Sequence, residues 1–229
     1  MPVEGCMTRV KFDTKLLPPS PDLSFERALW NKKLTLVAGI DEAGRGALAG
    51  PVAVGAVILP FDDANLLQKL QGVRDSKQMG VGQRQLWAEI IKQVALGWAV
   101  CLSESNEIDK LGIAAATRLA ARRAVEALAP LPQHLLIDYF HLSEVPLPQT
   151  SLVKGDCRAL SIACASVLAK TARDALMSEL DASYPEYGFA RHNGYGTERH
   201  LQAIAALGPC AIHRRSFSPF SGFILSNQG

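Results

Sequence analysis

The stretch from Leu34 to Pro60 constrains the fold of this 229-residue chain more than any other segment. An apolar, β-branched run, Leu34 to Ile40, ends on two adjacent carboxylates, Asp41 and Glu42. After a short glycine-containing segment a second apolar run extends from Val52 to Leu59. Runs of this length and composition predict two buried strands. A buried strand does not normally end on paired acids, so this pair calls for a chemical explanation.

Adjacent carboxylates at the end of a buried strand repel each other and lose hydration, and a divalent cation is the simplest group that would compensate them. Neighbouring side chains of an extended strand point to opposite faces, so we expect the pair where the strand breaks into a turn. Gly44 and Gly46 allow a ligand close to the backbone, and Arg45 offers a planar fork suited to phosphate. The alternative is a polar hairpin turn with no ligand.

Composition and charge narrow the class of protein. The net charge of +2, with 48% hydrophobic and 20% charged residues, is that of a globular protein and neither requires nor excludes a nucleic-acid partner. Basic residues are in excess from Phe189 to Gly229, where polyanion contact is therefore expected. The five cysteines are scattered without a CxxC pair, which predicts reduced thiols and no zinc site. With no membrane-length apolar run and no signal peptide, we expect a cytoplasmic protein.

The order of elements predicts an α/β fold, a mixed sheet with helices on its faces. We divide the chain into a leader (1–33), a main domain (34–180) and a C-terminal helical extension (181–229). The leader, with a short helix near its end, either packs on the main domain or trails from it. Further strands are expected at 96–102, 134–137 and 150–153. Further helices are expected at 83–94, from a cap at Ser105 to Leu128, from shortly after Asp156 to Leu180, and at 198–207.

Four acids stand at the ends of these elements: Asp41, Glu42, Asp138 and Asp156. Open α/β sheets gather functional groups at strand ends, so these residues can meet despite their separation in sequence. An oxygen-only cluster suits Mg²⁺ or Mn²⁺, and two such ions can hydrolyse a phosphodiester. Taken singly, Asp138 is better explained as a turn residue at the end of a strand, and Asp156 as a helix N-cap or first-turn acid. The hypothesis of a metal site rests on all four together.

Six segments carry distinctive motifs: Asp41-Glu42-Ala43-Gly44-Arg45-Gly46, Ile137-Asp138, Lys154-Gly155-Asp156, Ser161 to Lys170, Asn193 to Thr197 and His213 to Phe217. These motifs resemble those of ribonuclease HII, a type 2 ribonuclease H, and the resemblance spans roughly Val37 to Phe217. It implies that residues 34–180 form the catalytic domain and that the extension 181–229 binds substrate. Tyr139 departs from the family pattern because glycine is usual there, and Gly112 stands where asparagine is usual.

The resemblance implies a ribonuclease H-like fold and an enzyme that cleaves the RNA strand of RNA/DNA hybrids. It also implies nicking on the 5′ side of single ribonucleotides embedded in duplex DNA, by a two-metal mechanism that leaves 3′-hydroxyl and 5′-phosphate ends. The four acids would be both catalytic and metal-binding. The substrate-binding residues would be Gly44, Arg45 and Gly46 at the 2′-hydroxyl, Ser76 and Lys77 at backbone phosphate, and Tyr195 at the RNA-to-DNA junction.

Two alternatives remain open. A ribonuclease HIII-like enzyme would act on longer hybrids, but that family normally lacks the glycine-flanked arginine and carries an additional N-terminal domain. A non-catalytic binder of RNA/DNA junctions would gain nothing from clustered negative charge beside phosphate. We expect a monomer that binds nucleic acid and no membrane. The sequence leaves docking to a sliding clamp undecided.

Overall fold

The computed structural model describes residues 17–220. Cys6, the rest of the leader before residue 17, and residues 221–229 of the extension lie outside the described residues. The chain forms a five-stranded mixed sheet in the order β3-β2-β1-β4-β5. β1 pairs antiparallel with β2 and β2 with β3, whereas β1 pairs parallel with β4 and β4 with β5. The strands are β1 Val37–Ala43, β2 Val52–Ile58, β3 Gly97–Ser103, β4 His134–Asp138 and β5 Gln149–Leu152.

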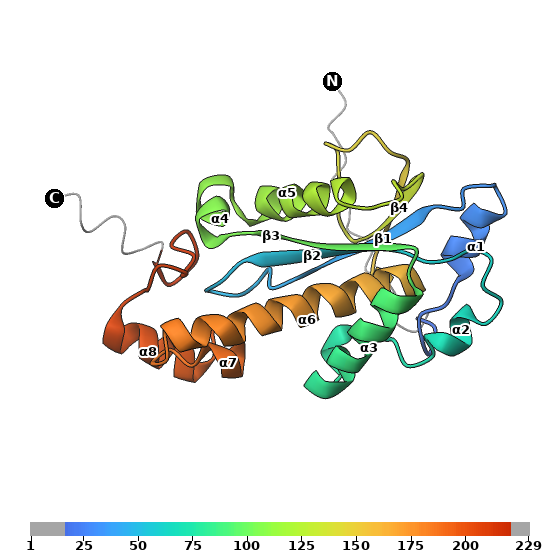
Figure 1. Cartoon of the computed structure of the whole chain (residues 1–229). Helices are drawn as coiled ribbons and strands as arrows, with labels where there is room; N and C mark the ends of the chain where they lie inside the picture. Colours follow the sequence, from blue (N-terminus) through green and yellow to red (C-terminus); the bar gives the residue numbers. More distant parts are fainter. Residues whose placement is uncertain (1–16, 221–229) are drawn as a thin grey trace, which may run out of the picture.

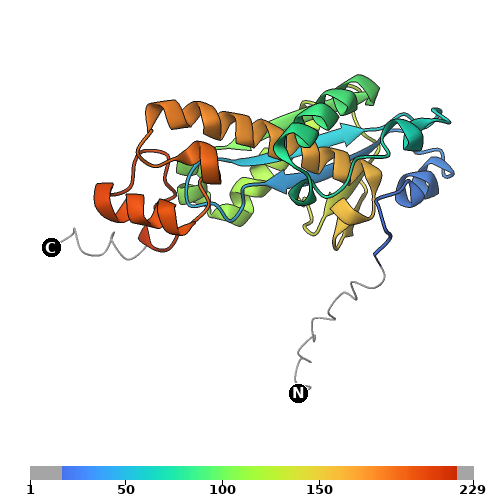
Figure 2. The same cartoon turned by 90° about the horizontal axis from the view of Figure 1, so that it is seen from below.

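Helices cover both faces of the sheet (Figure 1). One hydrophobic core lies between the sheet and α5, and another lies between the sheet, α3 and α6. Figure 2 shows α7 and α8 at one end of the molecule and α1 at the other. This arrangement confirms the predicted mixed sheet flanked by helices with a helical C-terminal region. The helices are α1 Ser24–Trp30, α2 Leu66–Lys69, α3 Val81–Val94, α4 Ser105–Leu111, α5 Ile113–Glu126, α6 Leu160–Ser183, α7 Phe189–His192 and α8 Glu198–Leu207, with 3₁₀ turns η2 Ser76–Gln78 and η3 Gly155–Cys157.

Two glycines allow α6 to lie unusually close to the central strands. A Cβ atom at Gly39 in β1 would lie 2.2 Å from the backbone carbonyl carbon of Ser161, and one at Gly55 in β2 would lie 2.3 Å from the carbonyl oxygen of Ala165. Both distances are far below van der Waals contact, so no larger residue fits without moving the helix. The small residues of α6 and these glycines together set the distance between helix and sheet.

Three local predictions were wrong. β1 continues through Ala43 because β2 pairs with it as far as Ala53, so the acidic pair lies inside a strand and not in a turn. The single helix expected from Ser105 to Leu128 is two helices, because Gly112 adopts a φ of 77°, which breaks α4 from α5. The N-cap of α4 is Glu104, whose backbone N–H donates to the Glu107 carboxylate (3.0 Å), and Ser105 is the first helical residue.

The described part of the leader packs on the main domain. Leu23 is buried in the core beneath α3 and α6. The Glu26 carboxylate of α1 is fully buried and accepts hydrogen bonds from the Ser161 backbone N–H (2.8 Å) and hydroxyl (2.6 Å). These bonds satisfy backbone and side-chain donors at the start of α6. The leader therefore helps to fix the end of α6 that lies next to Asp156.

Candidate active site

Asp41 and Glu42 lie in the middle of the sheet, near the end of β1. Asp41 is 3% exposed, and its Oδ1 accepts the Glu42 backbone N–H at 2.8 Å. The Glu42 side chain is more accessible and lies 3.6 Å from the Arg45 guanidinium. Successive strand residues alternate between faces, but the Glu42 carboxylate still lies close enough for its charge to raise the pKa of Asp41. Asp41 points toward α6, whose Ser166 hydroxyl stabilises its ionised form.

The other two acids reach the same region from neighbouring elements. β4 runs parallel to β1 with Ile40 opposite Ile137, so Asp41 and Asp138 follow on adjacent strands. Asp138 Oδ1 accepts the Gly155 backbone N–H at 2.7 Å, which ties β4 to η3. Asp156 follows in η3 and is 3% exposed. The structure thus brings the four predicted acids to one place, as expected for groups at the ends of parallel strands.

These carboxylates perturb one another. Burial raises the pKa of Asp41 well above its ordinary value, and the charges of Glu42, Asp138 and Asp156 raise it further. The pKa of Asp138 rises to about 6, chiefly through burial, against the stabilising hydrogen bond from Gly155. The pKa of Glu42 is also raised by burial, although the nearby positive charges oppose the shift. Buried like charges with raised pKa values are typical of functional sites, and a bound cation would compensate them.

The donor atoms of the site fit a hard divalent cation. Glu42 Oε2 and Asp156 Oδ1 are buried and have no hydrogen-bond partner. A buried carboxylate oxygen without a partner is costly unless a cation or water binds it. The four acids supply only oxygen, the ligand that Mg²⁺ and Mn²⁺ prefer. The tightest cluster of possible metal ligands within residues 17–220 is not this set of four acids. It consists of Asp75, Asp156 and Cys157, whose ligand atoms all lie within 4.8 Å of one another.

The glycine-flanked arginine lies next to the acids on a loop that is mostly buried and reaches the surface at Arg45 and Gly46. Gly44 has a φ of 86°, a conformation that other residues rarely adopt. Gly46 is exposed, and a Cβ atom there would meet nothing within 4 Å. The Arg45 side chain is 40% exposed. Open space before a glycine backbone is what a ligand that approaches the main chain requires.

Two buried arginines hold this loop, and sequence reasoning missed their role. Arg214 donates to the carbonyl oxygens of Gly44 (2.8 Å), Arg45 (2.9 Å) and Gly50 (2.9 Å). Arg173 of α6 donates to the carbonyl oxygens of Pro51 (2.8 Å), Ala49 (3.1 Å) and Asn193 (2.9 Å). Both side chains are fully buried. Arg214 therefore anchors the C-terminal segment and also shapes the Gly44–Gly50 backbone.

Ser76 and Lys77 lie on η2, at the edge of the acidic site. The Ser76 side chain is buried, and its hydroxyl pairs with that of Ser166 (2.9 Å). Lys77 is exposed, with its Nζ 3.9 Å from Asp156 Oδ2. Burial lowers the pKa of Lys77, but the surrounding acids, led by Asp156, more than reverse this and raise it. Only the lysine side chain is placed to reach a phosphate from outside.

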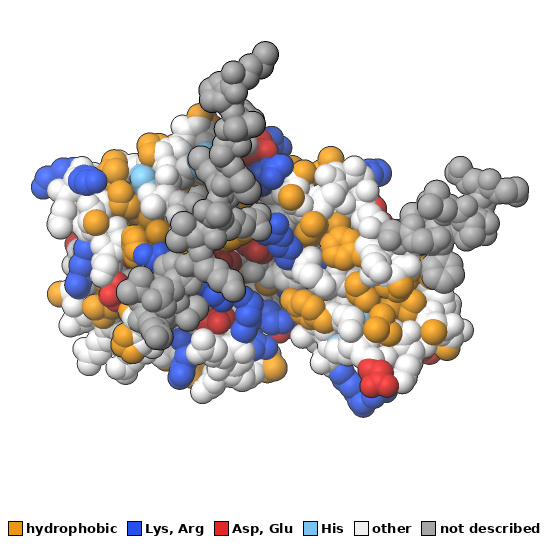
Figure 3. All heavy atoms as spheres, turned by 180° about the vertical axis from the view of Figure 1, so that it is seen from behind, with side chains coloured by type: hydrophobic (Ala, Val, Ile, Leu, Met, Phe, Trp, Pro, Cys, Tyr) orange, Lys and Arg blue, Asp and Glu red, His pale blue; other side chains and the backbone are white. Residues whose placement is uncertain are grey.

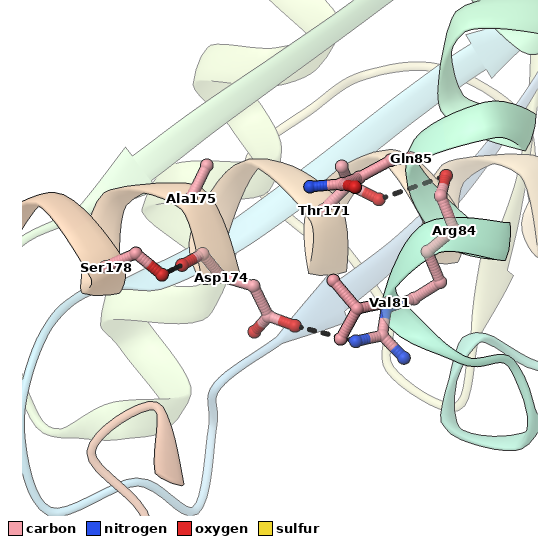
Figure 4. Close-up of a pocket in the computed structure, with 7 residues that line it drawn as sticks. All are labelled: Val81, Arg84, Gln85, Thr171, Asp174, Ala175 and Ser178. Atoms are coloured by element: carbon pink, nitrogen blue, oxygen red, sulfur yellow. Dashed lines mark hydrogen bonds and ion pairs between the residues drawn. The ribbon is translucent and has the colours of Figure 1, made fainter. Parts of the chain in front are cut away.

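A pocket between α3 and α6 is lined by Arg84 and Asp174, which hold the η2 turn in place (Figure 4). The Arg84 guanidinium donates to the carbonyl oxygens of Ser76 and Met79 and pairs with Asp174 of α6 (3.0 Å). Asp174 also pairs with Lys170 at 2.6 Å. Arg84 therefore ties the turn that carries Lys77 to the long helix.

Tyr195 lies on the loop between α7 and α8 and is 36% exposed. The Lys170 ammonium and the Arg173 guanidinium lie 5.6 Å and 5.5 Å from the centre of its ring. Cations at this distance stabilise an aromatic ring through its negative face.

Figure 3 shows Lys and Arg side chains beside acidic ones near the middle of the face opposite to that of Figure 1. Basic side chains there would favour the approach of a polyanion.

Comparisons with known proteins agree with this geometry. The family model described as "Ribonuclease HII" matches residues 38–219. The chain belongs to the ribonuclease HII family. It is 53% identical over 197 residues to a ribonuclease HII of Anaeromyxobacter, covering 86% of this chain and 61% of that protein. It is 48% identical to the ribonuclease HII of Thermus thermophilus, covering 85% of this chain and 91% of that protein.

Solved structures show the same fold. The structure of a PCNA:RNase HII complex from Archaeoglobus fulgidus matches with a TM-score of 0.67 and 26% identity, over 79% of this chain and 93% of that one. A Bst-RNase HIII solved with Mn²⁺ matches with a TM-score of 0.60 and 20% identity, over 86% of this chain and 71% of that one, which supports the fold alone. Family membership confirms the predicted resemblance and favours ribonuclease HII over ribonuclease HIII.

Membership of the ribonuclease HII family implies an endoribonuclease of the ribonuclease H class, whose substrates are RNA/DNA hybrids. Tyr139, where glycine is usual in the family, is 61% exposed and adopts a φ of 66°, a conformation that glycine adopts without strain.

The helices within residues 17–220 include none that is long and apolar enough to cross a membrane.

Proposed function

We propose that this protein cleaves RNA in RNA/DNA hybrids and nicks duplex DNA on the 5′ side of single embedded ribonucleotides, leaving 3′-hydroxyl and 5′-phosphate ends. Asp41, Glu42, Asp138 and Asp156 would hold two Mg²⁺ or Mn²⁺ ions. The observation that carries the proposal is the convergence of these four acids, with unpartnered buried oxygens on Glu42 and Asp156, beside a glycine-containing loop that is open to solvent at Gly46.

When bound, such ions generate a hydroxide nucleophile and stabilise the departing oxygen. The protein's own contribution is to position the ligands. The Gly155 N–H holds one oxygen of Asp138, and Asp41 is held by the Glu42 N–H and favoured in its ionised form by Ser166. Groups fixed in this way need little rearrangement when the substrate arrives, which lowers the cost of reaching the transition state.

Ribose recognition would come from the backbone of Gly44 to Gly46. Arg214 already holds the carbonyl groups of Gly44 and Arg45, so this backbone is fixed before the substrate binds. A rigid main chain beside the acids can hydrogen-bond a 2′-hydroxyl, the group that distinguishes RNA from DNA. Tyr195, supported by the cations of Lys170 and Arg173, would stack on the deoxyribose that follows the ribonucleotide. Lys77 would bind backbone phosphate.

The test is a panel of three substrates with Mg²⁺ or Mn²⁺: a duplex with one ribonucleotide, an RNA/DNA hybrid and an all-DNA duplex. We expect cleavage of the first two and none of the third. Asp138→Asn should abolish cleavage and leave substrate binding largely intact, because the amide cannot replace the charged ligand. Asp63→Asn is the matched control, since Asp63 pairs with Lys69 at the surface and should keep full activity. Normal cleavage by the Asp138 variant would show that the metal assignment is wrong.

The junction role of Tyr195 needs a separate measurement. Tyr195→Ala should reduce cleavage of the single-ribonucleotide duplex by at least about fivefold, the factor that corresponds to the loss of a contact worth about 1 kcal/mol. Cleavage of the continuous hybrid should fall much less. An equal loss on both substrates would remove Tyr195 from junction recognition.

A further inference from the structure

A cluster of three metal-binding side chains lies at the edge of the acidic site. Asp75 precedes η2, and Asp156 and Cys157 belong to η3. One ligand atom from each lies within 4.8 Å of the other two. Asp156 is 3% exposed and its Oδ1 has no hydrogen-bond partner, whereas Asp75 and Cys157 are partly exposed. The cluster therefore combines an unsatisfied buried oxygen with a thiol that solvent can reach.

The geometry of the surrounding turns favours this cluster. Asp75 Oδ1 accepts the Lys77 backbone N–H at 2.9 Å, so its carboxylate is held in place as the cap of η2. Lys154, which precedes η3, has a φ of 58° and turns the chain sharply before Asp156 and Cys157. Both turns are held independently of any metal. The three ligands would therefore need little movement to close on an ion.

A set of one thiolate and two carboxylates differs in chemistry from the four catalytic acids. Mg²⁺ and Mn²⁺ prefer oxygen ligands, whereas Zn²⁺ and Cd²⁺ bind thiolate sulfur as well as carboxylate. Three protein ligands leave a fourth position for water in a tetrahedral site. The Lys77 ammonium, 3.9 Å from Asp156, lies on a side chain that is 74% exposed and can swing into solvent when a cation binds.

We propose that Asp75, Asp156 and Cys157 form a second metal site, selective for a thiophilic divalent cation such as Zn²⁺ or Cd²⁺. As the metal–sulfur bond forms, the Cys157 thiol releases its proton to solvent, and no oxidation takes place. Because the site shares Asp156 with the catalytic acids, its occupation would withdraw one catalytic ligand and inhibit cleavage. The inhibition rests on the proposed function, whereas binding of the metal does not.

Binding is tested with Cd²⁺ alone, added to the full-length, chelator-treated protein under reducing conditions. A Cd–thiolate bond gives an ultraviolet charge-transfer absorption, which reports sulfur ligation without any assay of activity. We expect one saturable band in the wild type and its loss in Cys157→Ser. Cys101→Ser is the control, because Cys101 is a partly exposed thiol on β3 outside the cluster and should leave the band unchanged. A band that persists in Cys157→Ser would overturn the proposal.

A second variant separates the cluster from a cysteine that binds metal by itself. Asp75→Asn keeps the size of the side chain and removes one charged ligand, so we expect Cd²⁺ affinity to fall at least about tenfold. Unchanged affinity in this variant would show that Cys157 binds the metal without the cluster, which contradicts the proposal.

Inhibition is tested by adding Zn²⁺ to a cleavage assay run in excess Mg²⁺. We expect wild-type activity to fall with rising Zn²⁺ and Cys157→Ser to need at least about tenfold more for the same loss, with unchanged activity in Mg²⁺ alone. Equal sensitivity of the two proteins would refute inhibition through this site. If the wild type cleaved no substrate at all, the proposed function would fail, while the Cd²⁺ titration would still decide whether the site exists.

Discussion

Replacing Arg173 tests how strongly the buried arginines hold the loop beside the acids. The guanidinium is fully buried and donates three hydrogen bonds, of 2.8, 2.9 and 3.1 Å, to the carbonyl groups of Pro51, Asn193 and Ala49. Methionine fills similar space but donates none of them. Each bond to a charged group is worth about 1.5–3 kcal/mol, so the gross loss from the three bonds is about 4.5–9 kcal/mol.

The net loss is smaller because Arg173→Met also removes the cost of burying a charge. We therefore expect the free energy of unfolding to fall by about 3–5 kcal/mol, toward the low end of that gross range, because three buried carbonyl groups still lose their donors. Urea denaturation followed by circular dichroism measures this quantity directly. Arg122→Met is the matched control. Arg122 is 44% exposed and makes one ion pair with Glu126 at 3.6 Å, so its replacement should change the free energy by less than about 0.5 kcal/mol. A loss below about 1 kcal/mol in Arg173→Met would refute the reasoning.

Two predictions concern pH. Burial and the neighbouring His200 lower the pKa of His213 to about 4, so below its ordinary value of 6.5 the unfolded chain takes up the proton first and stability is lost as the pH falls. We expect this residue alone to make the free energy of unfolding about 2 kcal/mol lower at pH 5 than at neutral pH. Urea titrations should show this loss in the wild type, and His213→Asn should lack it. Because burial raises the pKa of Asp138 to about 6, its ionised form is lost below that pH, and calorimetric titration should show Mg²⁺ or Mn²⁺ affinity falling about tenfold per pH unit there. Affinity that is independent of pH between 5 and 7 would exclude Asp138 as a ligand.

The apolar runs, the order of elements and the acids were readable from the sequence because each has a local pattern. Hydrophobic composition was enough to predict the strands of the central sheet. The position of Asp138 and Asp156 next to a predicted strand or helix was enough to single out these two acids. The position of Asp41 and Glu42 inside β1 could not be predicted in this way. The end of β1 is set by pairing with β2, which continues to Ala43 and Ala53. Pairing of this kind depends on residues distant in sequence.

The buried arginines left no comparable pattern. Arg173 and Arg214 donate to backbone carbonyl groups, and a carbonyl is present at every residue, so no partner side chain reveals the contact. Asp75 and Cys157 were overlooked because η2 and η3 meet only in the folded chain. The break at Gly112 did have a signal, since glycine commonly ends helices.

The close contact of α6 with Gly39 and Gly55 has a consequence for how this protein can vary. One end of α6 carries Ser161 and Ser166, next to the acids, and the other carries Arg173, which reaches the loop of Tyr195. The helix therefore fixes the distance between the cluster of acids and the loop of Tyr195, and the absence of a side chain at Gly39 and Gly55 sets how close the helix lies to the sheet. A mutation to alanine at either glycine would displace the acids and the Tyr195 loop together, which makes these two positions intolerant of change although both are buried.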